Sequence, residues 1–144
     1  MRAITVRQPW AWQILHQGKD VENRTRNIAG KYRGPIAIHA ALKADELALA
    51  RLPMRAPDWV TAPRIFDYGV ILGVIDLVDV HQSAPFCCGS DWGELLWGGY
   101  HLVLANPRPI PRHQQPRCRG ALGLWTPPAG VVEELLAFAT QEAG

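Results

Sequence analysis

The sequence has few cysteines, no long hydrophobic run and almost no net charge. The sequence has three cysteines, of which Cys87 and Cys88 are adjacent. This number is small and odd, which argues against a disulfide framework. No apolar run reaches the roughly 18 residues of a membrane span. Arg2 and Arg7 interrupt the N-terminal stretch where a signal peptide would be hydrophobic. We therefore expect a cytoplasmic protein with no membrane partner.

Cofactor signatures are missing as well. The sequence contains no P-loop, no GxGxxG fingerprint and no set of histidines and cysteines at metal-ligand spacing. The adjacent cysteines lack the CxxC spacing of a zinc knuckle, so buried or half-buried thiols are the favoured interpretation of Cys87, Cys88 and Cys118. The sequence thus predicts neither a cofactor nor a metal site.

Length, composition and charge favour one small globular domain. The 144 residues suffice for one hydrophobic core and are too few for two. Hydrophobic residues make up 48% of the chain, which places it among folded rather than disordered proteins. A net charge of +2 is far below that of a protein that coats DNA, so any contact with nucleic acid must be local. We expect one domain over residues 1–144, with residues 128–144 as a C-terminal helical extension.

Patterns of hydrophobic and turn residues predict short strands mixed with helices. The expected strands are 2–6, 35–41, 70–80, 100–104 and the GALGLW segment at 120–125, and the expected helices are 10–17, 43–51 and 130–141. Residues 53–67 hold three prolines and are expected to form an irregular connection. Strands and helices do not alternate regularly enough for a parallel sheet. The prediction is an α+β fold, a mixed β-barrel of five to six strands with flanking helices.

The densest group of functional side chains lies near the end of the first expected helix. Lys19, Glu22 and Arg24 fall within six residues, and Glu22 and Arg24 share a face if the segment is extended, because strand side chains alternate. A lysine, a carboxylate and an arginine on one surface can pair with one another and still donate hydrogen bonds to a phosphate or a base edge. Composition alone leaves a solvated charged loop, an ion-pair brace and a ligand site as alternatives.

The order of these residues resembles the ASCH family. RQPW begins the first expected helix, GKDVENR follows, and the IAIHAA strand comes next. Lys19, Glu22 and Arg24 fall on the Lys, Glu and Arg of the family motif G-x-K-x-x-E-x-R, whereas Gln17 occupies the usual glycine position and Gly18 follows it. The later segments GVIDLVDV, YHLVLANPRPIP and RGALGLW are also similar, so the resemblance covers about residues 2–126.

The resemblance implies a PUA-like β-barrel with a cleft over the motif, a fold group that often handles RNA or modified bases. It implies RNA, single-stranded nucleic acid or a nucleoside as the partner, and we expect a monomer or a weak homodimer. The residues expected to bind this ligand are Gln8, Pro9, Trp10, Asn23, Lys31, Arg33, His39, Trp92 and Trp97.

Catalysis by Lys19, Glu22 and Arg24 is the alternative that the resemblance implies. Some small bacterial members of the family resemble amidohydrolases of acetylated cytidine, and one is described as a ribonuclease. In those amidohydrolases a lysine and a threonine, three apart, work with a glutamate from a later loop. Lys19 matches the lysine, but Glu22 stands at the threonine position and removes a hydroxyl nucleophile. Lys19 could act as a base, a nucleophile or an oxyanion stabiliser, and a further acid is expected from Asp91 or Glu94.

Six tryptophans are many for a chain of this size. Aromatic faces stack on bases at roughly 1–3 kcal/mol each, which makes exposed tryptophans candidate base contacts. Trp10 is expected on the cleft wall, Trp92 and Trp97 lie in a glycine-containing loop, and Trp97 is equally compatible with cleft and core. Trp125 follows a strand and is expected in the core.

Histidine and arginine residues elsewhere give weaker signals. His39 should point away from the face shared by Ile36 and Ile38, beside the cleft, as a ligand contact or as a buried, hydrogen-bonded histidine. Lys31 and Arg33 are expected to form a phosphate-facing rim with the late basic segment, or to be scattered surface cations. The apolar stripe of the C-terminal helix is expected to pack on the barrel, with a dimer contact as the alternative.

Three functions therefore compete. The first is a binding module for RNA, single-stranded nucleic acid or a modified nucleoside. The second is a hydrolase of an N-acylated nucleoside or of an RNA phosphodiester. The third is an interaction protein whose cleft is vestigial.

Overall fold

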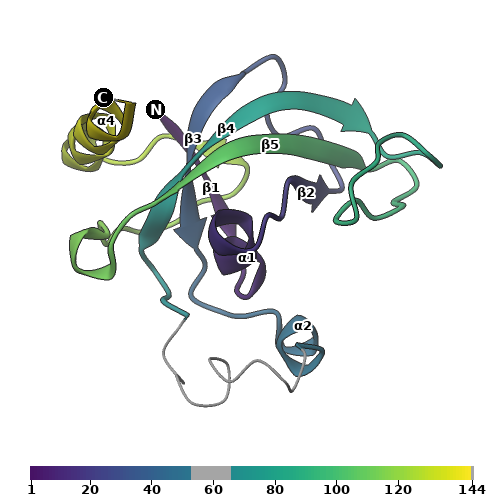
Figure 1. Ribbon diagram of the computed structural model, residues 1–144, viewed down its shortest axis with the longest axis horizontal. Helices are drawn as coiled ribbons and strands as arrows, with labels where there is room; N and C mark the ends of the chain where they lie inside the picture. The colour runs from purple at the N-terminus through teal and green to yellow at the C-terminus, as the bar shows by residue number, and fades with distance from the viewer. Residues whose placement is uncertain (53–65, 144) are drawn as a thin grey trace.

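The computed structural model describes residues 1–52 and 66–143, within which the chain forms one mixed β-sheet (Figure 1). The strands are β1 (Arg2–Val6), β2 (Val21–Arg24), β3 (Gly34–Ala40), β4 (Ile71–Gln82), β5 (Tyr100–Pro109) and β6 (Leu124–Trp125). Their order across the sheet is β2-β5-β4-β3-β1-β6. Neighbouring strands are antiparallel except β1 and β3, which run parallel. The predicted α+β class and the number of strands are confirmed.

The helices of the described residues are short apart from the last. They are α1 (Trp10–His16), α2 (Glu46–Ala50), a 3-10 turn η1 (Arg112–Gln114) and α4 (Ala129–Ala143). All three predicted helices are present, with bounds that differ by a few residues. Across residues 1–52 and 66–143, no helix has the length and apolar character to cross a membrane. The irregular connection predicted at 53–67 falls almost wholly outside the described residues.

The strands differ most from the predictions in three places, while the bounds of β3 and β4 differ by one or two residues. β2 forms over VENR, a segment that the sequence marked only as polar, because it pairs with β5 from Val21 to Arg24. β5 continues to Pro109, where the sequence indicated a proline-rich connection. Its prolines are tolerated because β2 pairs only with the first part of β5, so the rest of that edge needs no N–H donors. β6 has only two residues.

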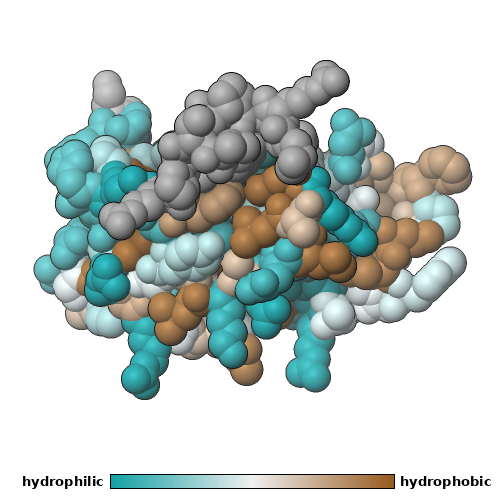
Figure 2. All heavy atoms as spheres, turned by 90° about the horizontal axis from the view of Figure 1, so that it is seen from below, coloured by the Kyte–Doolittle hydropathy of each residue, from teal (hydrophilic) through white to brown (hydrophobic). Residues whose placement is uncertain are grey.

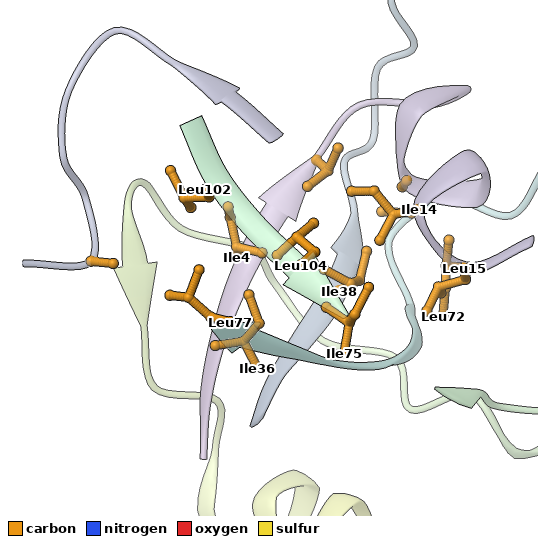
Figure 3. Close-up of a cluster of buried hydrophobic side chains, with 14 of the residues drawn as sticks. Ile4, Ile14, Leu15, Ile36, Ile38, Leu72, Ile75, Leu77, Leu102 and Leu104 are labelled. Carbon is orange, nitrogen blue, oxygen red and sulfur yellow. The ribbon is translucent and has the colours of Figure 1, made fainter. Parts of the chain in front are cut away.

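The sheet is buried on both faces along most of β3 and the first half of β4, and the long strands curl around the larger of two cores. Side chains from β1, β3, β4 and β5 meet those of α1 in this core, as Figure 3 shows for Ile4, Ile14, Ile38 and Leu104. Ile36 and Ile38 enter it, while Ala37 between them points into a second, smaller core. Burial on both faces explains why β3 and β4 read as continuous hydrophobic runs instead of alternating ones.

The smaller core lies between the sheet and α4. Trp125 is buried there together with Leu135, and Val131 and Phe138 of α4 pack against it. The predictions for Trp125 and for the packing of the C-terminal helix are therefore confirmed. On the surface, hydrophobic side chains are broken up by hydrophilic ones, as the face in Figure 2 shows.

Candidate functional site

The site begins where α1 ends. Gly18 adopts a positive φ of 71°, a conformation that favours glycine and that ends the helix. The backbone N–H of Lys19 then turns back to donate to the Gln13 carbonyl at 3.1 Å. This turn directs the Lys19 side chain inward, and Val21 begins β2 two residues later.

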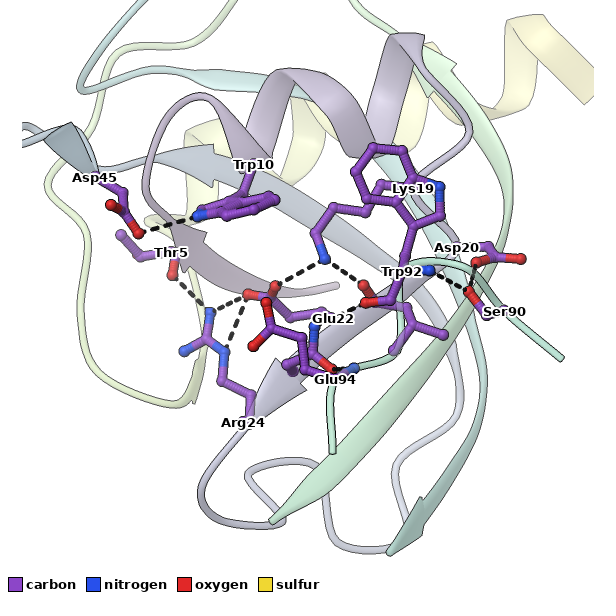
Figure 4. Close-up of polar contacts among 12 residues, drawn as sticks. Thr5, Trp10, Lys19, Asp20, Glu22, Arg24, Asp45, Ser90, Trp92 and Glu94 are labelled. Carbon is purple, nitrogen blue, oxygen red and sulfur yellow. Dashed lines mark hydrogen bonds and ion pairs between the residues drawn. The ribbon is translucent and has the colours of Figure 1, made fainter. Parts of the chain in front are cut away.

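Lys19 is a buried lysine, with 3% of its surface exposed. Its ammonium donates to the Val21 carbonyl and lies 3.7 Å from Glu22 Oε1. It also lies over the rings of Trp10 and Trp92, at 5.3 and 5.8 Å from their centroids (Figure 4). Burial lowers the pKa of Lys19, and the neighbouring carboxylates, Glu22 foremost, oppose that shift.

Glu22 and Arg24 form an ion pair within β2, and Arg24 also links this strand to β1, which is distant in the sheet. They share one face of β2, as predicted, and Arg24 donates from Nη2 and Nε to Glu22 Oε2 at 2.8 and 3.1 Å. Arg24 Nη2 also donates to the Thr5 carbonyl of β1 at 2.9 Å. Three strands separate β1 from β2 in the sheet, so this bond spans the opening of the curled sheet. The predicted ion-pair network of Lys19, Glu22 and Arg24 is thus present, and it lies at the opening of the curled sheet.

A cavity of about 790 Å³ opens over this network. Its charged lining residues are Arg7, Lys19, Glu22, Arg24, Asp45 and Glu94. Three cations face three carboxylates, so the formal charge of the lining is close to zero. Trp10 and the exposed Leu122 supply apolar surface. The arrangement offers hydrogen-bond donors and acceptors side by side, next to an aromatic ring.

The loop between β4 and β5 forms one side of the site. The side-chain amide of Asn23, on β2, makes two hydrogen bonds to the backbone of this loop. Its Nδ2 donates to the Trp92 carbonyl at 3.0 Å, and its Oδ1 accepts from the Glu94 N–H at 2.8 Å. Of the two acids that the sequence left open, Glu94 lines the cavity. Asp91 is exposed and is not part of the lining.

Trp10 is held in place on the cavity wall. Its indole Nε1 donates to Asp45 Oδ2 at 3.2 Å, and Asp45 also caps α2 by accepting from the Ala48 N–H at 3.0 Å. These two bonds lower the pKa of Asp45, with the Ala48 bond the larger cause. Trp10, Asp45 and Glu94 also line a smaller neighbouring cavity of about 320 Å³, into which Pro9 faces.

Several of the predicted ligand contacts, Trp92 among them, are not part of this cavity's lining. Gln8 is fully buried, where its amide donates to the Asp67 carbonyl and accepts from the Trp12 N–H. Trp97 is 82% exposed, so neither the cleft nor the core, the two alternatives, contains it. Lys31 and Arg33 are exposed and outside the cavity lining.

His39 also lies away from the cavity. The alternation along β3 was predicted correctly, but the face opposite Ile36 and Ile38 is covered by the smaller core, and His39 is 2% exposed there. Its Nε2 bonds to the Cys118 carbonyl at 2.8 Å, and Nδ1 lies 3.3 Å from Thr5 Oγ1. Burial lowers the pKa of His39. Of the two alternatives, the structure has the buried, hydrogen-bonded histidine.

Sequence reasoning missed four polar residues of the cavity. Arg7 and Thr25 flank the predicted group, while Thr5 and Asp45 come from β1 and from the start of α2. Of these four, only Asp45 had a recognisable sequence pattern: it immediately precedes a run of helix-forming residues, as an N-cap does. One group of potential metal ligands occurs within residues 1–52 and 66–143, and none of its members lines this cavity.

Comparison with known proteins gives structural matches alone. No protein-family model matches the sequence, and curated proteins include no significant match. Among solved structures, the chain matches the crystal structure of ASCH from Zymomonas mobilis with a TM-score of 0.52 and 14% identity, over 94% of this chain and 93% of that one. A point mutant of the Zymomonas protein matches with a TM-score of 0.54 and 15% identity, over 94% and 96%. The chain therefore has the PUA-like ASCH fold that the resemblance implied, whereas the motif assignment of Lys19, Glu22 and Arg24 stays a prediction.

Proposed function

We propose that this ASCH-fold chain binds a single base in its 790 Å³ cavity, as a nucleoside or as an unpaired nucleotide of RNA. The observation that carries the proposal is the combination of a fixed indole, Trp10, with the buried ammonium of Lys19 on the same wall. Aromatic side chains stack on any base, and cations beside them add to the attraction. A volume of this size lies within the range of small-molecule sites.

The charge balance of the lining favours a base over a phosphate chain. Proteins that track a nucleic-acid backbone use a positively charged groove. Here Arg24 is neutralised by Glu22, and Asp45 and Glu94 add acceptors that would repel phosphate. A base edge, by contrast, presents donors and acceptors together, which matches the alternating lining.

Replacing Trp10 with alanine is expected to weaken binding about 5- to 150-fold, because stacking contributes roughly 1–3 kcal/mol. Tryptophan fluorescence and calorimetric titration with the four common ribonucleosides, N4-acetylcytidine and a short single-stranded RNA would measure it. Trp97→Ala is the matched control, since Trp97 is exposed and outside the cavity. Equal losses in the two variants, or no binding of any of these compounds to the wild type, would contradict the proposal.

The salt dependence of binding affinity distinguishes a site for a base from a site for the phosphate backbone of RNA. A nucleoside carries no phosphate, so its affinity should change little between low and high salt, while an RNA that also contacts surface cations should weaken. Lys31→Ala and Arg33→Ala test those contacts. We expect both variants to leave nucleoside affinity unchanged, because neither residue lines the cavity.

A second candidate function, hydrolysis of an N-acylated nucleoside, is favoured by the state of Lys19. Burial lowers its pKa, which raises the fraction of neutral amine that can accept a proton. In such a reaction water would attack the acyl carbon, the bond from that carbon to nitrogen would break, and the base amine would leave with a proton. Lys19 would take the proton from water, and Glu94 is within the same cavity to pass one on.

Turnover of N4-acetylcytidine to cytidine and acetate tests this second function by chromatography. The expected result for a hydrolase is that Lys19→Met abolishes turnover while its circular dichroism spectrum and nucleoside-independent melting remain those of a folded protein. Lys31→Met is the control for loss of a positive charge. Binding of N4-acetylcytidine by the wild type without product formation would reject hydrolysis and leave the binding function.

A further inference from the structure

Four side chains of metal-ligand type converge below the loop between β4 and β5. His81 of β4 and His101 of β5 are paired across the two strands, and Cys87 and Cys88 come from the loop that joins these strands. One ligand atom from each of the four lies within 4.8 Å of all the others. His101 is buried and the other three are half-buried, so the group is partly shielded from solvent.

The distances within this group fit a tetrahedral metal ion. With bonds of about 2.3 Å to sulfur and about 2.0 Å to nitrogen, zinc requires about 3.8 Å between two sulfurs, about 3.5 Å between sulfur and nitrogen and about 3.3 Å between two nitrogens. The two Sγ atoms are 3.9 Å apart. His101 Nδ1 lies 3.4 Å from Cys87 Sγ, 3.6 Å from Cys88 Sγ and 3.1 Å from His81 Nε2.

The tautomer of His101 is fixed in the form that a metal ligand needs. Its Nε2 lies 2.6 Å from the Glu94 carbonyl, which can only accept, so Nε2 carries the proton and Nδ1 presents a lone pair. That lone pair faces the two sulfurs and His81. A backbone carbonyl on the far nitrogen is the usual outer partner of a metal-bound histidine.

The surrounding loop is shaped closely around these atoms. A Cβ on Gly93 would lie 3.3 Å from Cys88 Sγ and 3.1 Å from His101 Cε1, so only glycine fits without displacing a ligand side chain. Phe86, which precedes the cysteines, has a positive φ of 59° within a turn that the Cys87 N–H closes by donating to the Ala84 carbonyl at 3.2 Å, and this turn leads the chain into the two cysteines.

We propose that His81, Cys87, Cys88 and His101 bind one Zn²⁺ ion as a closed, structural site. Four protein ligands leave no open position for substrate, and two thiolates with two imidazoles suit zinc among the common divalent metals. This proposal departs from the expectation from the sequence, where the adjacent cysteines lacked the usual spacing. The fold supplies the two remaining ligands, His81 and His101, which are 20 residues apart in sequence and lie on neighbouring strands.

The zinc site would fix the loop that forms one side of the base cavity. His101 holds the Glu94 carbonyl, and Ser83 Oγ donates to the same oxygen at 2.9 Å. Glu94 lines the cavity, and Trp92 lies over Lys19. The ion is therefore a positioning element: its removal should loosen the loop without removing any group that contacts the ligand.

Metal content and spectroscopy of the full chain test the proposal. Protein purified under reducing conditions from zinc-supplemented cells should contain about one zinc per chain by mass spectrometry, and a Cys87→Ser/Cys88→Ser variant should contain almost none. Cys118→Ser is the matched control, since Cys118 packs against the smaller core and is not one of the four clustered ligands, so this variant should leave zinc content unchanged. Cobalt substitution should give a sulfur-to-cobalt charge-transfer band and the visible bands of a tetrahedral site.

Removal of the ion gives a second readout that does not depend on the base cavity. Chelation under reducing conditions should lower Tm by about 5–15 °C and increase amide exchange over residues 83–99. Trp10→Ala should keep its zinc, which separates this proposal from the binding function. Zinc content equal in the wild type and the double cysteine variant, or a cobalt spectrum without the sulfur band, would overturn it.

Discussion

Glu22→Ala is expected to destabilise the protein by about 3 kcal/mol at pH 7, because it leaves the Lys19 ammonium buried without its nearest counter-charge. Lys19 is 3% exposed, and the carboxylate that it would lose lies 3.7 Å away. The same substitution frees Arg24, which pairs with Glu22 at 2.8 Å, although Arg24 is more exposed and keeps its bond to the Thr5 carbonyl. Equilibrium denaturation in urea would give the free energy of unfolding.

The pH dependence of this loss identifies Lys19 as its cause. In the folded state the pKa of Lys19 is below the ordinary value of 10.5, chiefly because of burial. Between that lowered pKa and 10.5 the unfolded chain binds one proton more than the folded chain, so stability rises with pH. In Glu22→Ala the ammonium is penalised more strongly, and Lys19 loses its proton at a lower pH. The deficit relative to the wild type should therefore be largest near neutral pH and shrink toward pH 10.

Two further variants isolate the Lys19–Glu22 interaction. Lys19→Met should cost less than Glu22→Ala, since Glu22 keeps its pair with Arg24, and the double variant should lose the alkaline rise in stability. Glu94→Ala removes an exposed carboxylate from the same cavity and should change stability by no more than about 0.5 kcal/mol. Equal costs for Glu22→Ala and Glu94→Ala, or a pH-independent deficit, would refute this account.

Hydrophobic pattern was sufficient to predict most elements of the fold. β1, β3 and β4 are runs of apolar, largely β-branched residues, and α1 and α4 lie between turn residues, so local sequence determines them. β2 escaped prediction because its two charged residues point toward the ion-pair network, and its strand conformation depends on pairing with β5. β5 could extend through its prolines because part of one edge has no neighbouring strand. That depends on the order of strands in the sheet, which the local sequence does not reveal.

The candidate site was predictable only where its residues are close in sequence. Lys19, Glu22 and Arg24 could be grouped because Glu22 and Arg24 belong to one four-residue strand that begins two positions after Lys19. Asp45 and Glu94 reach the cavity through the path of the chain, and no local pattern ties them to Lys19. The same holds for His81 and His101, which only the β4–β5 register brings to the two cysteines. His39 was misplaced because its strand is covered on both faces.

Gly73→Ala is expected to destabilise the protein by about 3 kcal/mol, through overpacking where α1 crosses the sheet. A Cβ at this position of β4 would lie 2.6 Å from the Arg108 carbonyl oxygen and 2.9 Å from both terminal carbons of Leu15. Leu15 could move, but the Arg108 carbonyl belongs to the neighbouring strand β5 and cannot shift without breaking the pairing of Val74 with Arg108. Thermal denaturation should show Tm lowered by roughly 6–12 °C.

Gly130→Ala is the matched control, since a methyl group there meets no atom within 4 Å. Gly130 lies in the first turn of α4, where alanine is the better helix former, so this variant should be neutral or slightly more stable. Gly73→Ala has a functional consequence that Gly130→Ala lacks. Displacement of α1 moves the turn at Gly18 that directs Lys19 into the cavity, so nucleoside affinity should fall along with stability. Retained affinity and stability in Gly73→Ala would mean that α1 does not need to lie this close to the sheet.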